Sequence, residues 1–369
     1  MGVSETYRRG RTFVADRPAA AILAVFGVLL GLDFVRRLAT GVVGYSQFAT
    51  YLWEGLVIGL LIGLAGIGLS LTYSILNFAN FAHGDYLTVG GFTGWAVAFI
   101  VAGLGQFDLG NLFLLTTASG GPSSTAVGIN VTSTPIIVVV GLIAAVVLTV
   151  AVALVIDRLA YRPMRNADGI SLLIASVGVA FILRYLIVFF WFSGKPGITD
   201  GYGARTTIAG VIINTHEVAV IVSAVVLMLG VHLLLQRTKL GKAMRAMADN
   251  RDLAQVTGIP VERVITTTWV VGAGLAGAAG YLVVLLRGTI IFDFGWVLLL
   301  LIFAAVILGG IGSVYGAIVG GLAIGMATEV SRVWLLGDLS GLTQPVAFGL
   351  MILILLIRPS GIFGGVKTA

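Results

Sequence analysis

The sequence gathers the groups that could do chemistry into one short stretch, "LNFANFAHGDY", which runs from Leu76 to Tyr86. This stretch holds two asparagines, a histidine and an aspartate between two apolar runs, in a chain with only three histidines. Polar and ionisable groups are costly inside a membrane, and where they occur they mark ligand paths or proton relays. The candidate substrate-pathway residues are Asn77, Asn80, His83 and Asp85.

A structural role for the same residues is the alternative. Asp85 precedes an apolar run, and its carboxylate is placed to cap a helix by accepting amide protons of the first turn. His83 can satisfy a neighbouring carbonyl. Counting spans puts the stretch near the inner end of its hairpin, which favours this structural role, whereas a helix break at the membrane midplane would favour ligand contact. Arg184 and Glu329 are further ionisable groups within apolar segments.

The elements that must position these groups are membrane-spanning helices. Of the 369 residues, 58% are hydrophobic and only 10% are charged, whereas about a quarter are charged in a typical soluble domain. Residues 135–156 carry no charge and match the length of a helix that crosses a bilayer core of roughly 30 Å. The predicted fold is an all-α polytopic membrane protein with about eight to ten spans.

The apolar segments predict where the spans lie. They fall near residues 19–32, 55–76, 86–105, 135–156, 170–192, 218–235, 264–286, 295–309, 314–336 and 343–357. The segment 295–309 and its glycine-rich successor are short and poorly separated, which predicts a re-entrant or broken hairpin. We expect a basic tail with an extra first helix in 1–54, a transmembrane domain in 55–364 and a short tail in 365–369.

Basic residues set the expected orientation, because Arg and Lys stay disproportionately on the cytoplasmic side. Placing both termini inside leaves most of the 22 basic residues there. The basic residues left outside are Arg36, Arg37, Lys195, Arg205 and Arg287. The net charge of +6 then reflects topology and contact with anionic lipid headgroups, and nothing indicates a nucleic-acid partner. The expected location is the cell membrane.

Several functional classes lack their signatures. The chain has no cysteine, which excludes disulfides, thiolate metal sites and cysteine nucleophiles. The histidines lack the H-E-x-x-H spacing, and no G-x-S-x-G occurs. No phosphate-binding G-x-x-x-x-G-K-[ST] loop occurs, and "GAGLAG" at 272–277 lies inside an apolar helix without a preceding strand. We therefore expect no catalytic residue, no metal ligand and no cofactor bound by this chain.

The 51 glycines include several at four-residue spacing. This spacing puts small residues on one face of a helix, where helix backbones can approach closely in lipid. We expect tight helix packing rather than a ligand role. The glycines concerned are Gly55, Gly59, Gly63, Gly272, Gly280, Gly316 and Gly320.

The most soluble-looking segment is the predicted cytoplasmic coupling segment 237–263. Its first half reads as an amphipathic helix, with Leu240, Met244 and Met247 at three- and four-residue spacing. Gly258 and Pro260 then end it. A compact docking knob is one interpretation, and a charged loop that only sets topology is the other.

Several motifs together resemble the permease subunits of branched-chain amino acid importers of the ATP-binding-cassette (ABC) class, in particular the H-type member. They are "NFAHGD" at 80–85, "AYRPMR" at 160–165, "LLIASVGVAFILR" at 172–184, the segment from "RTKLGKAMRAMADN" to "GAGLAGAAG", "AAVILGGIGSVYGAIVGGLAIG" at 304–325, and "RPSGIFG". The resemblance runs from about Gly55 to Gly364. The extra first helix, the long loop 106–134 and the apolar "TIIFDFGWVLLLLIF" depart from the family pattern.

The resemblance implies a set of partners. These are a second, M-type permease subunit, two ATP-binding subunits that use ATP and magnesium, and an extracytoplasmic solute-binding protein, all at a lipid membrane. The residues expected at the ATPase contact are Ala248, Asp249, Asp252, Gly258, Ile259, Pro260, Glu262 and Arg263.

The resemblance also implies a substrate class, branched-chain or related amino acids. A permease for urea or short amides is the alternative within the same class. An ion-coupled secondary transporter or channel, with His83 and Asp85 as a proton relay, is the alternative from a different class. Transport by this chain alone, without ATP, would distinguish that last possibility.

Overall fold

The computed structural model describes residues 18–103, 129–191 and 203–364. The predicted tails, most of the long loop 106–134, and Lys195 lie outside these residues. The helices are α2 (Pro18–Ala39), α3 (Tyr45–Leu76), α4 (His83–Ala102), α6 (Pro135–Ile156), α7 (Gly169–Trp191), α8 (Thr215–Arg237), α9 (Lys239–Asp249), α10 (Arg251–Val256), α11 (Val261–Arg287), α12 (Phe294–Gly309), α13 (Val314–Val330) and α14 (Thr343–Ile357). A π-helical turn, Asp157–Tyr161, extends α6, and two 3₁₀ turns, Ser331–Val333 and Gly337–Leu342, follow α13.

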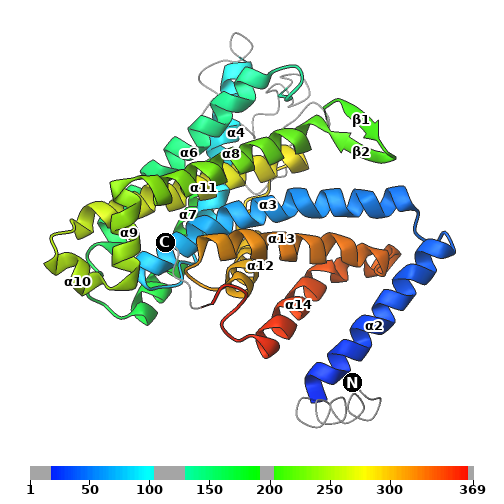
Figure 1. Cartoon of the computed structure of the whole chain (residues 1–369). Helices are drawn as coiled ribbons and strands as arrows, with labels where there is room; N and C mark the ends of the chain where they lie inside the picture. Colours follow the sequence, from blue (N-terminus) through cyan, green and yellow to red (C-terminus); the bar gives the residue numbers. More distant parts are fainter. Residues whose placement is uncertain (1–17, 104–128, 192–202, 365–369) are drawn as a thin grey trace.

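The helices confirm the all-α polytopic fold. Within the described ranges, eight helices, counted with their one-turn extensions, are long and apolar enough to cross a membrane. α12 is shorter, at 16 residues. The only strands among the described residues are β1 (Arg205–Ile208) and β2 (Val211–Asn214), an antiparallel hairpin just before α8. In Figure 1, this hairpin and the α9–α10 pair lie at opposite ends of the helix bundle. We refer to them as the hairpin end and the α9–α10 end.

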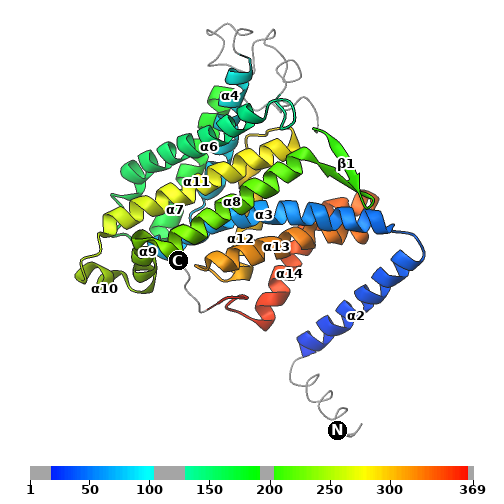
Figure 2. The ribbon, with the colours of Figure 1, turned by 45° about the horizontal axis from the view of Figure 1, so that its top comes forward.

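The centre of the bundle is built from α3, α11 and α4, whose own window is 72% buried, and α13 packs against α3. The window of α3 that could span a membrane is 89% buried and that of α11 is 83% buried, whereas α8 and α14 are mostly exposed along theirs. Figures 1 and 2 both show α3 lying alongside α13. Because a lipid-facing helix needs no polar cover, the exposed apolar faces of α6, α7, α8 and α14 suit contact with lipid or with another membrane subunit.

Small residues permit this close packing. A Cβ on Gly59 would lie 2.9 Å from the Cα of Leu322, and one on Gly280 would lie 1.9 Å from the backbone oxygen of Leu87. The glycines at four-residue spacing therefore lie where helix backbones touch. Gly55, Gly59 and Gly63 face α13, Gly272 faces α3, Gly280 faces α4, and Gly316 and Gly320 face α12.

The beginning of α3 differs from the sequence expectation. The helix begins at Tyr45, so the domain boundary predicted at residue 55 falls inside it. At 32 residues, α3 is about 48 Å long at 1.5 Å per residue, longer than a bilayer core. The apolar pattern starts at residue 55 because the first turns of α3 are polar or half-exposed and extend beyond the core of the bundle.

The extra helix α2 stands apart from the bundle. Figures 1 and 2 show it leaving the start of α3 at a steep angle. Its contacts lie near its end, where Phe34 packs on Phe48 with ring centroids 4.8 Å apart and Arg37 donates to the Val333 oxygen at 3.2 Å. Val28, Leu29 and Leu32 are exposed.

Candidate functional site

The helix α4 begins deep inside the bundle. The Nε2 atom of His83 lies 2.9 Å from the backbone oxygen of Ala65, and His83 is 1% exposed. Since a carbonyl oxygen can only accept, this nitrogen carries the proton. Ala65 lies 11 residues before the end of α3, which is about 16 Å along the helix. The first turn of α4 therefore lies well inside the bundle.

The chain between α3 and α4 returns through the bundle without helical structure. Asn77 ends α3 in the left-handed conformation, with φ of 55°. Polar groups then satisfy the free backbone: Asn80 Oδ1 accepts from the Ala82 amide at 3.1 Å, and Ser176 Oγ of α7 accepts from the Phe81 amide at 3.0 Å. Irregular backbone at this depth is stable because protein groups pair with it.

A buried ion pair joins the first turn of α4 to α7. Arg184 Nε donates to one carboxylate oxygen of Asp85 at 3.1 Å, and its Nη2 donates to the other at 3.0 Å. Asp85 is fully buried and Arg184 is 8% exposed. The guanidinium also lies 4.6 Å from the ring centroid of Trp296 and 5.4 Å from that of Phe181. This two-point pair and the aromatic faces compensate both charges inside the bundle.

Two expectations about this stretch are wrong. Asp85 does not cap α4: the capping position is Ala82, which makes no side-chain capping bond, and the Asp85 carboxylate binds Arg184 instead. The stretch is also not confined to a turn at the end of the bundle. Arg184 lies 15 residues after Gly169, about 22 Å along α7, so the pair lies in the interior. The sequence pattern marks where apolar runs stop, not how far the chain folds back between them.

The start of α12 meets the start of α4. A Cβ on Gly84 would lie 2.7 Å from the Gly295 oxygen, and a Cβ on Gly295 would lie 2.0 Å from the Gly84 oxygen. Both helices thus begin inside the bundle with a glycine at their contact. Broken helices whose N-termini meet at mid-depth are typical of transporter binding sites, because their free amide groups and dipoles favour anionic ligand groups. The broken hairpin expected at 295–309 is thus matched by a second break before α4.

Asn80 adds an open polar group to this region. Its Oδ1 accepts from the Tyr161 hydroxyl at 3.3 Å as well as from Ala82. Its Nδ2 is buried and has no hydrogen-bond partner among the described residues. A donor in this position can bind a carbonyl or carboxylate oxygen. Asn77, by contrast, is exposed, so the structure does not bring all four predicted pathway residues together.

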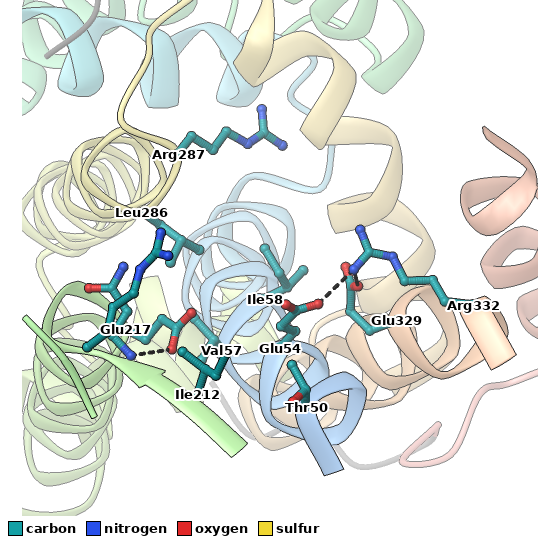
Figure 3. A pocket seen from close by; sticks show the side chains of 12 residues that line it. Thr50, Glu54, Val57, Ile58, Ile212, Glu217, Leu286, Arg287, Glu329 and Arg332 are labelled. Atoms are coloured by element: carbon teal, nitrogen blue, oxygen red, sulfur yellow. Dashed lines mark hydrogen bonds and ion pairs between the residues drawn. The ribbon is translucent and has the colours of Figure 1, made fainter. Parts of the chain in front are cut away.

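A second polar region lies at the hairpin end of the bundle. A cavity of about 450 Å³ opens between α3, α8, α11 and α13 and the β-hairpin. Figure 3 shows its charged side chains converging from these separate elements. The lining residues are Thr50, Glu54, Val57, Ile58, Arg205, Ile212, Asn214, Glu217, Leu286, Arg287, Glu329 and Arg332. Of these charged groups, Glu329 stands out in the sequence as an ionisable residue within an apolar segment. Most of the other charges lie at or near the ends of apolar segments, and that position is the signal by which the sequence could have indicated them.

The segment 237–263 forms two short helices at the other end. Thr238 Oγ1 accepts from the Gly241 amide at 2.9 Å and begins α9, and Asn250 Oδ1 accepts from the Leu253 amide at 2.9 Å and begins α10. Met244 and Met247 are at most 3% exposed and attach α9 to the bundle. The amphipathic pattern therefore predicts the buried face of α9. The short helix α10 was not predicted from the pattern.

The residues expected at the ATPase contact occupy three kinds of position. Asp249, Asp252, Gly258, Pro260, Glu262 and Arg263 are exposed, Ile259 is half-buried and Ala248 is buried. Glu262 forms ion pairs with Arg165 and, at 3.7 Å, with Arg162. Its carboxylate therefore connects the start of α11 to the connection between α6 and α7. Among the described residues, no group of three or more acidic or histidine side chains is arranged to hold a metal ion.

Comparison with known proteins places these features in a family. Residues 51–357 match the model of the branched-chain amino acid transport system permease component. The high-affinity branched-chain amino acid transport system permease protein BraD of Pseudomonas aeruginosa is 30% identical over 324 residues, which cover 86% of this chain and 96% of BraD. No solved structure matches the chain.

Two further relatives also match this chain over most of their length. The permease protein LivH of Escherichia coli is 28% identical over 325 residues, covering 87% of this chain and 96% of LivH. A probable LivH of Methanocaldococcus jannaschii is 30% identical over 316 residues, covering 82% of this chain and 89% of that protein. Each of the three matches covers more than four fifths of this chain.

Proposed function

Because this chain belongs to the permease family of branched-chain amino acid transport systems, we propose that it forms half of the translocation pathway of an ABC importer. In this role a second, M-type permease subunit supplies the other half, two ATP-binding subunits supply the energy, and an extracytoplasmic solute-binding protein delivers the substrate. The chain itself binds no nucleotide and catalyses no reaction.

The orientation follows from the distribution of charge. The α9–α10 end carries the basic segment 237–263 and the basic connection 157–168, so we place it in the cytoplasm. Both termini are then cytoplasmic, and the hairpin end with its charged cavity faces the outside of the cell membrane. This orientation puts the ATPase side and the substrate-entry side at opposite ends of the bundle.

The observation that carries the proposal is the exposed apolar tip of α10. Leu253 is 60% exposed and Val256 is 85% exposed, although α9 beside them is held by buried methionines. A loop that only set topology would have no reason to present apolar side chains to water. An ordered helical knob with an apolar tip can instead transmit movement between an ATP-binding subunit and the bundle.

The pathway is proposed to pass the meeting point of α4, α7 and α12. Phe181 on α7 is 45% exposed beside the buried Asp85–Arg184 pair, and Val297 near the start of α12 is 43% exposed. This face suits contact with the second permease subunit, since it joins an apolar surface to helix N-termini that begin inside the bundle. Branched-chain amino acids fit the mixture of polar ends and apolar surroundings.

Site-specific crosslinking and uptake test the proposal together. Val256→Cys and Asp252→Cys in the assembled complex should crosslink to an ATP-binding subunit, whereas Val218→Cys, exposed on α8 near the hairpin end, should not. Proteoliposomes with the whole complex should take up leucine, isoleucine or valine only with ATP. Uptake by this chain alone without ATP would contradict the proposal. Uptake of urea but not of amino acids would show that the substrate is urea and not a branched-chain amino acid.

A further inference from the structure

We propose that the charged cavity at the hairpin end is a binding site for the zwitterionic head of an amino acid. The inference rests on the proposed function, because it supplies the entry site from which a released amino acid reaches the interior of the bundle. The cavity collects three glutamates and three arginines from segments far apart in the sequence. The charges are unevenly paired across it: Arg332 faces two of the glutamates, and Arg287 has no ion-pair partner among the described residues.

The negative excess lies between α3 and α13. A single nitrogen of Arg332, Nη1, contacts Glu54 Oε2 at 2.7 Å and Glu329 Oε2 at 2.9 Å. One guanidinium therefore faces two carboxylates, so these two acids are not matched one to one by cations among the described residues. Figure 3 shows Glu54, Glu329 and Arg332 gathered on one side of the cavity. A primary ammonium group, with three donors and one positive charge, supplies what these carboxylates lack.

The positive excess is Arg287, the last residue of α11. It is exposed into the cavity and makes no hydrogen bond or ion pair with any residue that the structure describes. In Figure 3 its side chain extends from the end of α11 over the cavity, and its guanidinium lies apart from the group of Glu54, Glu329 and Arg332. An arginine binds a carboxylate through two parallel N–H donors, so this side chain is suited to the carboxylate of the same ligand.

Glu217 holds one wall of the cavity in place and is not assigned a contact with the ligand. Its Oε2 accepts from Trp53 Nε1 at 2.7 Å and from the Asn214 amide at 3.0 Å, where it completes the capping of α8. These bonds join the hairpin and α8 to α3 and fix one wall of the cavity. The apolar groups that line the remaining space are Val57, Ile58, Ile212 and Leu286.

The arrangement therefore contains an ammonium site, a carboxylate site and an apolar wall. A volume of about 450 Å³ accommodates a small ligand. A purely structural ion-pair network is the competing explanation, and it accounts for Arg332 between Glu54 and Glu329. It does not account for Arg287, which stabilises no partner in the described part of the chain. Arg287 is accordingly the residue on which the two explanations differ.

Equilibrium binding to the purified, nucleotide-free complex tests the inference without the solute-binding protein. Saturation-transfer NMR would give dissociation constants for L-leucine and for isoamylamine, which has the same side chain and ammonium group but no carboxylate. Arg287→Gln should weaken L-leucine at least about tenfold, since bonds to charged groups carry that much affinity. Isoamylamine should bind the variant and the wild type equally, and Arg287→Lys should lie between for L-leucine.

Two further variants complete the design. Glu54→Gln should weaken both ligands, because both carry the ammonium group. Arg36→Gln is the matched control: Arg36 pairs with Asp33 on α2 at 2.6 Å, outside the cavity, and its loss should change neither constant. Thermal unfolding of each complex would show that the variants fold.

The inference is overturned if Arg287→Gln binds L-leucine as the wild type does, or if the wild-type complex transports leucine with ATP but shows no binding at this site. Failure of the proposed function looks different, because the wild-type complex with its solute-binding protein would then show no ATP-dependent uptake of branched-chain amino acids.

Discussion

Asp85 and Arg184 form a two-point ion pair between α4 and α7, with N–O distances of 3.1 and 3.0 Å. The residues lie 99 positions apart in the chain, and each removes the cost of the other's charge inside an apolar bundle. The pair therefore fixes the depth at which α4 begins, and with it the position of His83 and of the contact between α4 and α12.

Breaking this pair should destabilise the protein strongly. Asp85→Asn leaves the Arg184 charge without its partner, and Arg184→Gln leaves the Asp85 charge without its partner. Each should lower the free energy of unfolding by about 3–5 kcal/mol, whereas the double variant, which leaves no net charge, should recover most of the loss. Denaturant unfolding of the detergent-solubilised complex would measure this. Single variants as stable as the wild type would show that the pair does not hold α4 in place.

Replacement of His83 separates a structural from a direct transport role. His83→Ala removes the donor that the Ala65 oxygen has in addition to its bond within α3, and it leaves a buried cavity, which together should cost about 1–3 kcal/mol. His83→Gln keeps a donor on a side chain of similar reach. Because the imidazole is 1% exposed and already bonded, the Gln variant should recover both assembly and uptake. A Gln variant that assembles with wild-type stability but takes up no substrate would instead place His83 on the pathway.

Two glycines of α11 provide a matched test of helix packing. An added methyl at Gly280 would lie 1.9 Å from the Leu87 oxygen, so Gly280→Ala must push α11 and α4 apart. The same change at Gly274 meets only Val146 and Val150 side chains at 3.4 Å. We expect Gly280→Ala to cost about 1–3 kcal/mol and Gly274→Ala to be near neutral. Thermal unfolding of the two variants would check this, and equal melting temperatures would contradict it.

Much of the fold could be predicted from apolar patterning. The span of α6 matches the predicted segment 135–156, and α8 and α11 lie within a few residues of their predictions. The amphipathic pattern identified the buried Met244 and Met247. Apolar residues that recur every three or four positions lie on one face of a helix, and that face packs against the protein and away from water. The start of α3 was misplaced because the helix begins at Tyr45 with polar or half-exposed turns, and its apolar pattern starts only near residue 55.

The candidate sites depended on contacts between distant segments. The sequence by itself determined the class of protein, the approximate spans and the concentration of polar groups at Asn77 to Asp85, because hydrophobic length and local composition are properties of consecutive residues. Only the tertiary structure decided that the chain folds back into the bundle, that Asp85 meets Arg184, and that Glu54, Arg287 and Arg332 line one cavity. Those relationships arise from packing of separate helices, and the position of a charge along one helix does not specify which other helix compensates it.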